Sequence, residues 1–331
     1  MDWELILRNA VRSAVGEDAA VYALAAIGLN MHFGYTGLLN FGQVGFAACG
    51  AYGIGIAVAT YGLSMWMGIF LGLLAAVVLA LLLGLPTLRL RGDYLAIVTI
   101  AAGEIIRIVM RSSQFNDVTG GSDGLQAFSE RFNELNPLSA GEYGFWVLRF
   151  TAPDTWVLIV GWTMVALSSL VVFLLVRSPW GRVVKAIRED EDAVRSLGKN
   201  VYAYKMQSLV LGGVIGALSG LVFAFSRGSV QPANYSTTFT FFAYTVLILG
   251  GTARVLGPVI GSMMFWLLFR FTDVGLRQAT EAGYIPDALL SGTQIGQVRL
   301  MLVGLGLMLL MIFRPQGVFG DKNEVAISAR R

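Results

Sequence analysis

Long apolar segments alternate with short polar ones along nearly the whole chain. An α-helix needs about 20 mainly apolar residues to cross the hydrocarbon layer of a membrane. Segments of that kind lie at residues 19–35, 42–60, 64–86, 93–111, 155–176, 205–225, 238–253, 256–272 and 298–313. The pattern predicts an all-α integral membrane protein, a polytopic bundle of about nine transmembrane helices (range about 8–10) forming one domain over residues 1–331.

The longest strongly polar interruption is the 177–205 loop, RSPWGRVVKAIREDEDAVRSLGKNVYAYK. It holds seven Lys or Arg and four Asp or Glu residues, so it cannot lie in hydrocarbon. Its basic excess predicts a cytoplasmic position. Residues 182–197 contain no Pro or Gly, which predicts one helix lying across the loop, with Leu197 among its apolar positions and Gly198 as its stop.

The other loops agree with that orientation. The basic segment 87–92 and the tail after Arg314 fall on the cytoplasmic side, whereas the acidic segments 112–154 and 273–297 fall outside. The N-terminus would also lie outside. Residues 112–154 form a long external loop, which is either a simple cap over the bundle or a surface for an extracytoplasmic partner.

Composition strengthens the membrane interpretation and excludes several other classes. Charged residues make up 14% of the chain, against about 25% in soluble domains, and the mean hydropathy is +0.67. A net charge of +3 is too small to indicate nucleic-acid binding. The single cysteine, Cys49, allows no intrachain disulfide. The charged first 20 residues lack the apolar core of a cleaved signal peptide.

Polar residues within membrane segments commonly mark a pathway. One such group surrounds a stretch rich in glycine, and we call it the polar cluster: Asn30, His32, Thr36, Asn40 and Gln43. Gly34, Gly37 and Gly42 make an unbroken helix improbable there, and a broken helix must face protein or a water-filled cavity. The cluster therefore either lines a translocation path or its gate, or marks a structural kink. His32, the only histidine, is expected to be a hydrogen-bonded interior residue rather than a metal ligand.

Two further features admit a structural explanation. Glu104 and Arg107 stand three residues apart on one predicted helix, where they can pair; we favour a structural pair over an ion-coupling site, and keep Glu104 as a candidate for the path. Glycines at four-residue spacing, at 212, 216 and 220 and again at 257 and 261, allow helices to approach closely, most simply within one subunit.

The chain shows no positive sign of an enzyme or a cofactor site. None of its four lysines stands in a phosphate-binding G-x-x-x-x-G-K-[ST] motif. Residues 290–294, LSGTQ, resemble the signature peptide of ABC ATPases, but they lie in a predicted external loop, and we treat the match as a coincidence. There is no metal-binding cluster and no pairing of a nucleophile with a base.

Several stretches in order carry a family resemblance. They are 27–43 (IGLNMHFGYTGLLNFGQ), 88–99 (LRLRGDYLAIVT), 103–107 (GEIIR), 119–125 (TGGSDGL), 181–191 (GRVVKAIREDE) and 250–261 (GGTARVLGPVIG). Together they resemble the LivM-type permeases of branched-chain amino acid ABC importers over about residues 20–318. Asp192-Ala193-Val194 followed by Gly198 is similar to the E-A-A-x-x-x-G coupling motif of importer permeases, although Asp replaces Glu and Val replaces the second Ala.

The resemblance implies a multi-pass permease in the cytoplasmic membrane of a prokaryote. Its partners would be a LivH-type permease, two LivG/LivF-type ATPases and an extracytoplasmic binding protein that delivers leucine, isoleucine or valine. The 177–205 loop would dock on an ATPase. Its expected contact residues are Gly181, Arg182, Lys185, Ile187, Arg188, Glu189, Asp190, Asp192, Ala193 and Gly198.

Two alternatives remain at this stage. Permeases for urea or short-chain amides share similar motifs, so the substrate is open. An ion-gradient-driven transporter would need no ATPase and would usually contain two inverted repeats with matching broken helices. The only counterpart to the break near residue 34 is the poorly matched Gly-Gly pair at 250–251.

Overall fold

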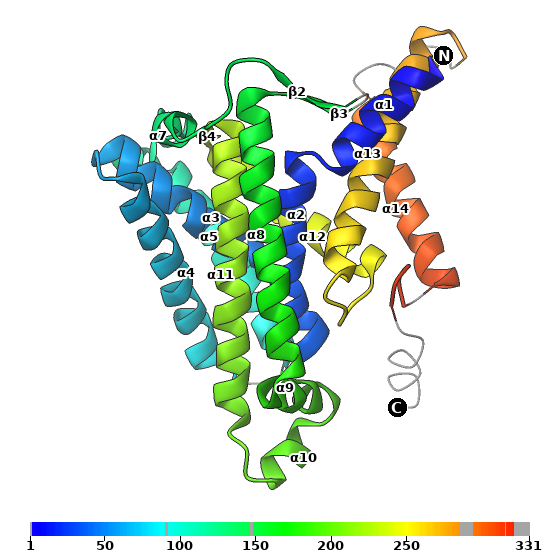
Figure 1. Cartoon of the computed structure of the whole chain (residues 1–331). Helices are drawn as coiled ribbons and strands as arrows, with labels where there is room; N and C mark the ends of the chain where they lie inside the picture. Colours follow the sequence, from blue (N-terminus) through cyan, green and yellow to red (C-terminus); the bar gives the residue numbers. More distant parts are fainter. Residues whose placement is uncertain (1, 90–91, 146–147, 285–293, 315, 321–331) are drawn as a thin grey trace.

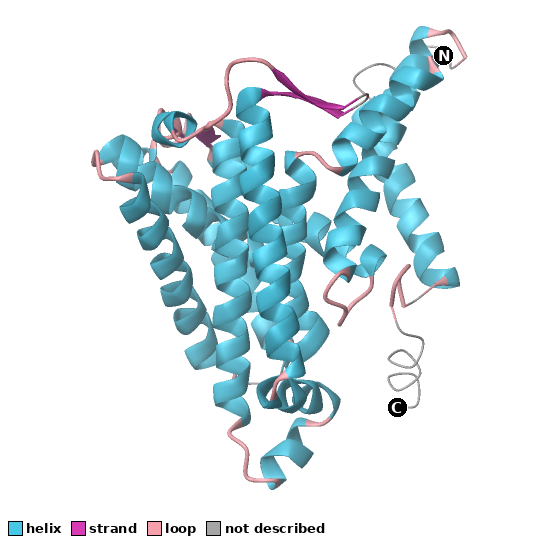
Figure 2. Cartoon of the chain, in the orientation of Figure 1, coloured by secondary structure: helices cyan, strands magenta, loops and turns pink. Residues whose placement is uncertain are grey.

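The computed structural model describes residues 2–320, except residues 90–91, 146–147, 285–293 and 315. All nine apolar segments contain helix (Figures 1 and 2). Their bounds are α2 Glu17–Leu29 continued by the π-helix η1 Asn30–Tyr35, α3 Gln43–Gly55 continued by the π-helix η2 Ile56–Thr60, α4 Met65–Thr87, α5 Gly92–Arg111, α8 Ala152–Arg177, α11 Val201–Arg227, α12 Thr237–Gly250, α13 Gly257–Glu281 and α14 Ile295–Phe313.

Six of these helices are long and apolar enough to cross a membrane within the described residues. They are 43–60, 65–87, 152–177, 201–227, 257–281 and 295–313. The predicted class, an all-helical polytopic membrane protein, is therefore confirmed, while the predicted number of spans stays a prediction. Two predicted ends were wrong: α12 ends at Gly250 rather than at 253, and α13 continues to Glu281 rather than ending at 272.

Helix α2 is the centre of the bundle. All of its residues from Ala19 to Leu29 are buried, and α3, α8, α11, α12 and α13 all contact it. A helix that is apolar and buried all round has no lipid-facing side. Its alanines and glycine keep it thin, so the helices around it approach closely.

Helix α11 packs against α2, α3 and α4 along its glycine face. A Cβ added at Gly212 would lie 2.5 Å from the carbonyl oxygen of Gly28, and one at Gly220 would lie 1.8 Å from that of Ala47. Neither site can hold a larger residue without moving a neighbouring backbone. The expectation that this glycine face serves packing within one subunit is confirmed.

One end of the bundle carries α1 and residues 112–154 (Figure 1). Helix α1, Trp3–Ala14, packs against α13. The 112–154 segment contains η3 Ser113–Phe115, α6 Asn116–Thr119, β1 Leu125–Gln126, α7 Glu130–Glu134, β2 Glu142–Phe145 and β3 Leu148–Thr151. Strands β2 and β3 form an antiparallel hairpin, and β1 pairs with β4, Ser229–Val230, just before η4 Pro232–Tyr235. The segment is thus a folded cap rather than an irregular loop.

The opposite end carries the 177–205 loop (Figure 1). It forms two helices, α9 Pro179–Glu189 and α10 Glu191–Ser196, and not the single helix predicted over 182–197. Asp190 breaks the helix because its carboxylate accepts the backbone N–H groups of Asp192 and Ala193, both at 3.0 Å, and so caps α10. Gly198 ends α10 with a φ of +76°, as expected of a glycine stop.

The first part of the predicted external loop 273–297 belongs to α13 instead. Asp273 is only 3% exposed and ion-pairs with Arg270, Arg277 and Arg299. Arg299 lies on α14, so the buried carboxylate ties α13 to α14. The ATPase-like peptide at 290–294 falls outside the described residues except for Gln294, as does most of the C-terminal tail.

Candidate functional site

The polar cluster lies where helix α2–η1 ends and the chain turns back into α3. Backbone groups there leave regular helix: Gly37 has a φ of +73°, and residues 37–42 are not helical. The predicted break after Gly34 is confirmed. The non-helical segment is held from both sides, since Tyr244 of α12 donates its hydroxyl to Asn40 O at 2.9 Å and Phe41 N donates to Thr99 of α5 at 3.1 Å.

All five residues of the polar cluster are buried, each at most 2% exposed, and the structure joins three of them, His32, Asn40 and Gln43, by hydrogen bonds. His32 Nε2 lies 3.0 Å from Leu209 O, so this nitrogen carries the proton and donates. His32 Nδ1 then accepts from Asn40 Nδ2 at 3.0 Å, and the same amide donates to Gln43 Oε1 at 3.2 Å. The histidine is thus a neutral, hydrogen-bonded interior residue, as predicted.

The remaining polar groups also find partners within the protein. Gln43 Nε2 donates to the carbonyls of Ala25 and Gly212, both at 3.3 Å. Thr36 shares a 2.6 Å hydrogen bond with Ser208, and both hydroxyls reach Met31 O. Met31 O belongs to the π-helix η1, whose carbonyls lack regular α-helical pairing. The bonds of Gln43 join α3 to α2 and to α11.

The two glycine-rich breaks of the chain lie against each other. Asn30 donates to Arg254 O at 2.8 Å and accepts from Ala253 N at 2.9 Å. A Cβ at Gly34 would lie 2.8 Å from Ala253 N. The C-terminal segment binds just before the 251–256 turn, where Val318 N donates to Leu249 O, near the end of α12, at 3.0 Å. Sequence reasoning compared the two breaks only as repeats and missed that Asn30 joins them.

Glu104 does not belong to this arrangement. It lies on α5 and pairs with Arg107, whose Nε reaches both carboxylate oxygens at 3.0 and 3.1 Å. Their side chains are 37% and 23% exposed in the single chain. The predicted pairing is confirmed, and the pair lies apart from the hydrogen bonds of the polar cluster.

Helix α9 lies at the end of the bundle opposite α1 (Figure 1) and contacts the broken helix directly. Arg188 donates a hydrogen bond to the carbonyl of Gly34, and Lys185 lies with its Nζ 5.8 Å from the ring centre of Tyr35. The α9 side chains of Val184 and Ile187 are buried, and Ile187 belongs to a small apolar cluster with Val194 and Val201. Helix α9 is therefore attached to η1 through Arg188 and Lys185, and we call α9 the lever.

Gly181 permits the close approach of α9 to α8. A Cβ there would lie 2.3 Å from the carbonyl of Val176. The tight turn begins at Ser178, whose side chain caps α9. Helix α9 is therefore packed closely against the end of α8, in addition to its hydrogen bond to η1.

The outward face of the 177–205 loop is polar except at its tip. The exposed members of the predicted contact set are Arg182, Lys185, Glu189, Asp190, Asp192, Ala193 and Gly198. Leu197 was predicted to be an apolar position of the 182–197 helix; it lies just after the end of α10, and its side chain is 79% exposed.

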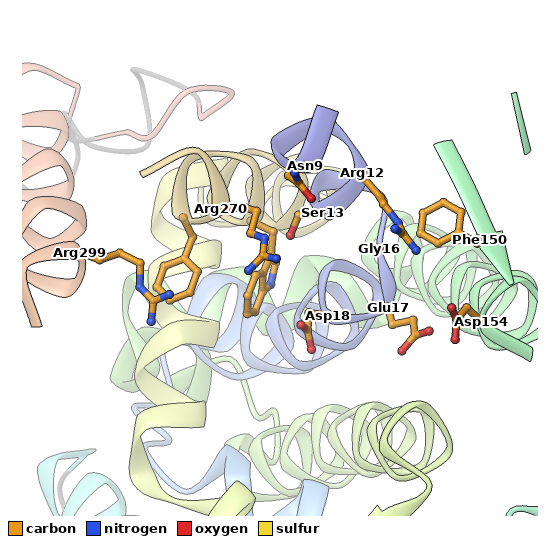
Figure 3. Close-up of a pocket in the computed structure, with 12 residues that line it drawn as sticks. Asn9, Arg12, Ser13, Gly16, Glu17, Asp18, Phe150, Asp154, Arg270 and Arg299 are labelled. Carbon is orange, nitrogen blue, oxygen red and sulfur yellow. The ribbon is translucent and has the colours of Figure 1, made fainter. Parts of the chain in front are cut away.

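The opposite end contains a cavity of about 360 Å³ between α1, the start of α2 and α13 (Figure 3). Its charged residues are largely engaged within the protein. Asp18 pairs with Arg227 at 2.9 Å, Arg299 pairs with Asp273, and the Arg12 guanidinium lies 4.7 Å from the ring centre of Phe150. These contacts hold α1 and the β3 strand against the bundle.

The fold is that of a multi-pass helical membrane protein, with a broken helix in its core and two short helices, α9 and α10, at one end. The chain belongs to the family described as branched-chain amino acid transport system / permease component, whose family model matches residues 14–312. It is accordingly a membrane permease subunit of a transporter rather than an enzyme.

Curated relatives support this assignment. The chain is 32% identical to the high-affinity branched-chain amino acid transport system permease LivM of Escherichia coli (strain K12), over 90% of this chain and 67% of the relative. It is 25% identical to the probable LivM of Methanocaldococcus jannaschii, over 91% of both chains. The LivH permease of Escherichia coli (strain K12) is 25% identical over 80% of this chain and 83% of its own length. No solved structure gives a significant match to the chain.

Proposed function

We propose that the chain is the LivM-type subunit of an ABC importer for leucine, isoleucine and valine. A LivH-type permease would pair with it, two LivG/LivF-type ATPases would drive it, and an extracytoplasmic protein would deliver the substrate. The substrate proposal rests on the printed names of relatives that span nearly the whole chain. The similarity to LivH is consistent with two related permeases acting side by side.

In this proposal all nine apolar helices cross the membrane of a prokaryotic cell. Helices α2–η1, α5 and α12 join the six that length and apolarity already support. The 177–205 loop and the C-terminus lie in the cytoplasm. The basic 177–205 loop and the acidic 112–154 cap stand at opposite ends of the bundle, as the positive-inside rule requires (Figure 1).

The observation that carries the proposal is the contact between Arg188 and the Gly34 carbonyl. This contact joins α9, which the proposal places in the cytoplasm, to the broken helix α2–η1 of the core. The carbonyl of Gly34, near the end of the π-helix, accepts this hydrogen bond from a charged guanidinium. A charge-assisted hydrogen bond is stronger than one between neutral groups. Force on α9 therefore reaches η1, and through Asn30 it reaches the 251–256 turn.

The mechanism follows from these connections. ATP binding closes the ATPase pair and displaces α9 and α10, which the ATPase grips through Leu197 and the charged residues around it. The hydrogen bond from Arg188 to Gly34 O then displaces η1 together with α9. The polar cluster exchanges its closed hydrogen bonds for an open arrangement, while the loaded binding protein rests on the 112–154 cap. This chain performs no chemical step.

The test is uptake by the complete importer reassembled in proteoliposomes with its ATPases, LivH-type subunit and binding protein. Arg188→Gln, Leu197→Ser and replacement of Gly198 should each lower leucine uptake at least about tenfold, the range for central interface residues. ATP hydrolysis should persist in the Arg188→Gln variant, because its α9–η1 link is broken while the ATPase surface remains.

Leu63→Ser is the matched control for Leu197→Ser. Leu63 is 43% exposed in the turn between η2 and α4, outside both the 177–205 loop and the 112–154 cap, so its replacement should leave the coupling of hydrolysis to uptake unchanged. Normal uptake in both the Arg188 and the Leu197 variants would reject the lever. Inhibition of uptake by excess urea or acetamide, but not by valine, would reject the substrate and leave the lever intact.

A further inference from the structure

A second cavity, of about 630 Å³, opens beside the lever between α8, the 251–256 turn and the start of α13. Three cationic side chains line it, from Arg177, Lys185 and Arg254, and none of the described residues that line it is a carboxylate. The Arg177 guanidinium lies 4.0 Å from the ring centre of Phe173, and Lys185 faces the Tyr35 ring. The cavity therefore presents concentrated positive charge.

The positive charge is reinforced by the first turn of α13. This helix of 25 residues begins at Gly257 in the cavity wall, and no side chain caps its N-terminus. The N-terminal end of a long helix carries partial positive charge and favours anions, above all phosphate groups. The cations and the helix end thus point to the same kind of ligand.

The rest of the wall is apolar and extends into the membrane. Ser169 lies on α8, about 12 Å along the helix axis from Arg177 at about 1.5 Å per residue, and it also lines the cavity. Its hydroxyl is buried and has no hydrogen-bond partner among the residues that the structure describes. Leu170 and Leu256 border the cavity and are 53% and 60% exposed, so it opens sideways toward the lipid.

We propose that this cavity binds an anionic phospholipid, with its phosphate held by Arg177, Lys185 and the α13 N-terminus. One acyl chain would run along the apolar wall past Leu170. A basic pocket between transmembrane helices at the membrane surface is the usual form of such a site. The lipid would then lie against Lys185 of the lever and the 251–256 turn, which Asn30 joins to the broken helix. This inference is independent of which substrate the permease carries.

Native mass spectrometry of the detergent-purified chain tests it. Phosphatidylglycerol and phosphatidylethanolamine with identical acyl chains would be titrated in parallel. We expect phosphatidylglycerol to bind at least about fivefold more tightly, and Arg177→Gln to weaken it about tenfold. Lys199→Gln is the matched control, because it removes one exposed charge from the same loop but lies outside the cavity.

A second variant tests the apolar wall. Leu170→Trp should block the side opening and weaken both lipids, while the variant remains monodisperse since Leu170 is already exposed. Equal binding of the two lipids, or equal losses in the Arg177 and Lys199 variants, would overturn the proposal. Displacement of the lipid by millimolar glycerol 3-phosphate would reassign the cavity to a soluble phosphate. Loss of bound lipid when the ATPases are added would reassign it to a protein contact.

Discussion

Two groups of polar residues dominate this membrane protein, and they behave in opposite ways. The residues of the polar cluster are uncharged and at most 2% exposed, and they hydrogen-bond to one another or to nearby backbone groups. The 177–205 loop is charged and largely exposed, and it directs only a few side chains at the bundle. Burial without water requires a partner for every polar group, whereas exposed charges need none.

This difference separates residues that hold the fold from residues free to serve a partner. In the cluster, replacing one side chain leaves several buried groups unpaired. In the loop, most side chains can change at little cost to folding, which is the property that a docking surface needs. Arg188 is where the two regions meet, because its guanidinium leaves the loop and binds a core carbonyl.

The strongest contrast is expected between two glycines. In Gly212→Ala the new methyl would lie 2.3 Å from His32 Nε2 and 2.5 Å from Gly28 O, both fixed by packing. Overpacking of this kind costs about 3 kcal/mol or more. Gly198→Ala meets nothing within 4 Å, and only the φ of +76° opposes it, at about 1 kcal/mol. Thermal unfolding of both variants in detergent measures the difference.

Accumulation in the membrane provides a second reading of the same pair. Gly212→Ala should reduce the amount of folded protein severely, and Gly198→Ala should leave it near the wild-type level. Equal unfolding temperatures for the two variants would mean that α11 shifts freely against α2. The core would then be no more constrained than the loop.

Two asparagines give a matched comparison of intermediate size. Asn40→Leu removes hydrogen bonds to His32 and Gln43 and to the backbone N–H of Gly42, and should cost about 2–4 kcal/mol, since buried groups lose their partners. Asn200→Leu removes only the exposed cap on Ala203 N at the start of α11, at about 1 kcal/mol.

Unfolding temperature and leucine uptake should be measured for both asparagine variants. Asn40→Leu should lose both stability and uptake, and Asn200→Leu should retain most of each. A stable Asn40→Leu protein without uptake would show that the cluster acts as a gate rather than as a support. That result would sharpen the comparison by giving the core a role in transport.

The positions of the helices could be predicted from sequence because membrane helices satisfy their own backbone and must be apolar. The errors occurred where a side chain changes that balance locally. Asp190 splits the predicted 182–197 helix by capping α10. Asp273 lets α13 continue past its apolar stretch because arginines neutralise it.

The candidate site was predictable in its residue types but not in its partners. Glycines beside Asn30 and Asn40 indicated a break, yet the sequence does not say that Asn30 binds Ala253 and Arg254, more than two hundred residues away. The sequence pattern put Leu197 among the apolar positions of one helix, and did not show that α10 ends before it and leaves it exposed. Contacts between distant segments depend on the whole packing, which local periodicity does not encode.

The smallest expected effect is that of the ion pair between Glu191 and Lys205, which docks α10 on α11. The hydrogen bond and charge of Lys205, with Arg195 beside it, lower the pKa of Glu191, although partial burial opposes them. Its stabilisation is therefore complete above the ordinary glutamate pKa of about 4.3 and is lost as the pH falls through the lower folded value. Because Glu191 is 39% exposed, the pair should contribute only about 0.2–1 kcal/mol.

Amide hydrogen exchange of α10, corrected for the intrinsic rate, measures this small term. Glu191→Gln should lower protection at pH 7 by up to about fivefold, equivalent to about 1 kcal/mol, and the two proteins should converge as the pH falls through the lowered pKa of Glu191. Asp192→Asn is the control, since its 81% exposed carboxylate pairs only within α10 and does not reach α11. A pH-independent difference for Glu191→Gln would show that packing of Val194, and not charge, holds α10, which would bring this part of the loop closer to the behaviour of the core.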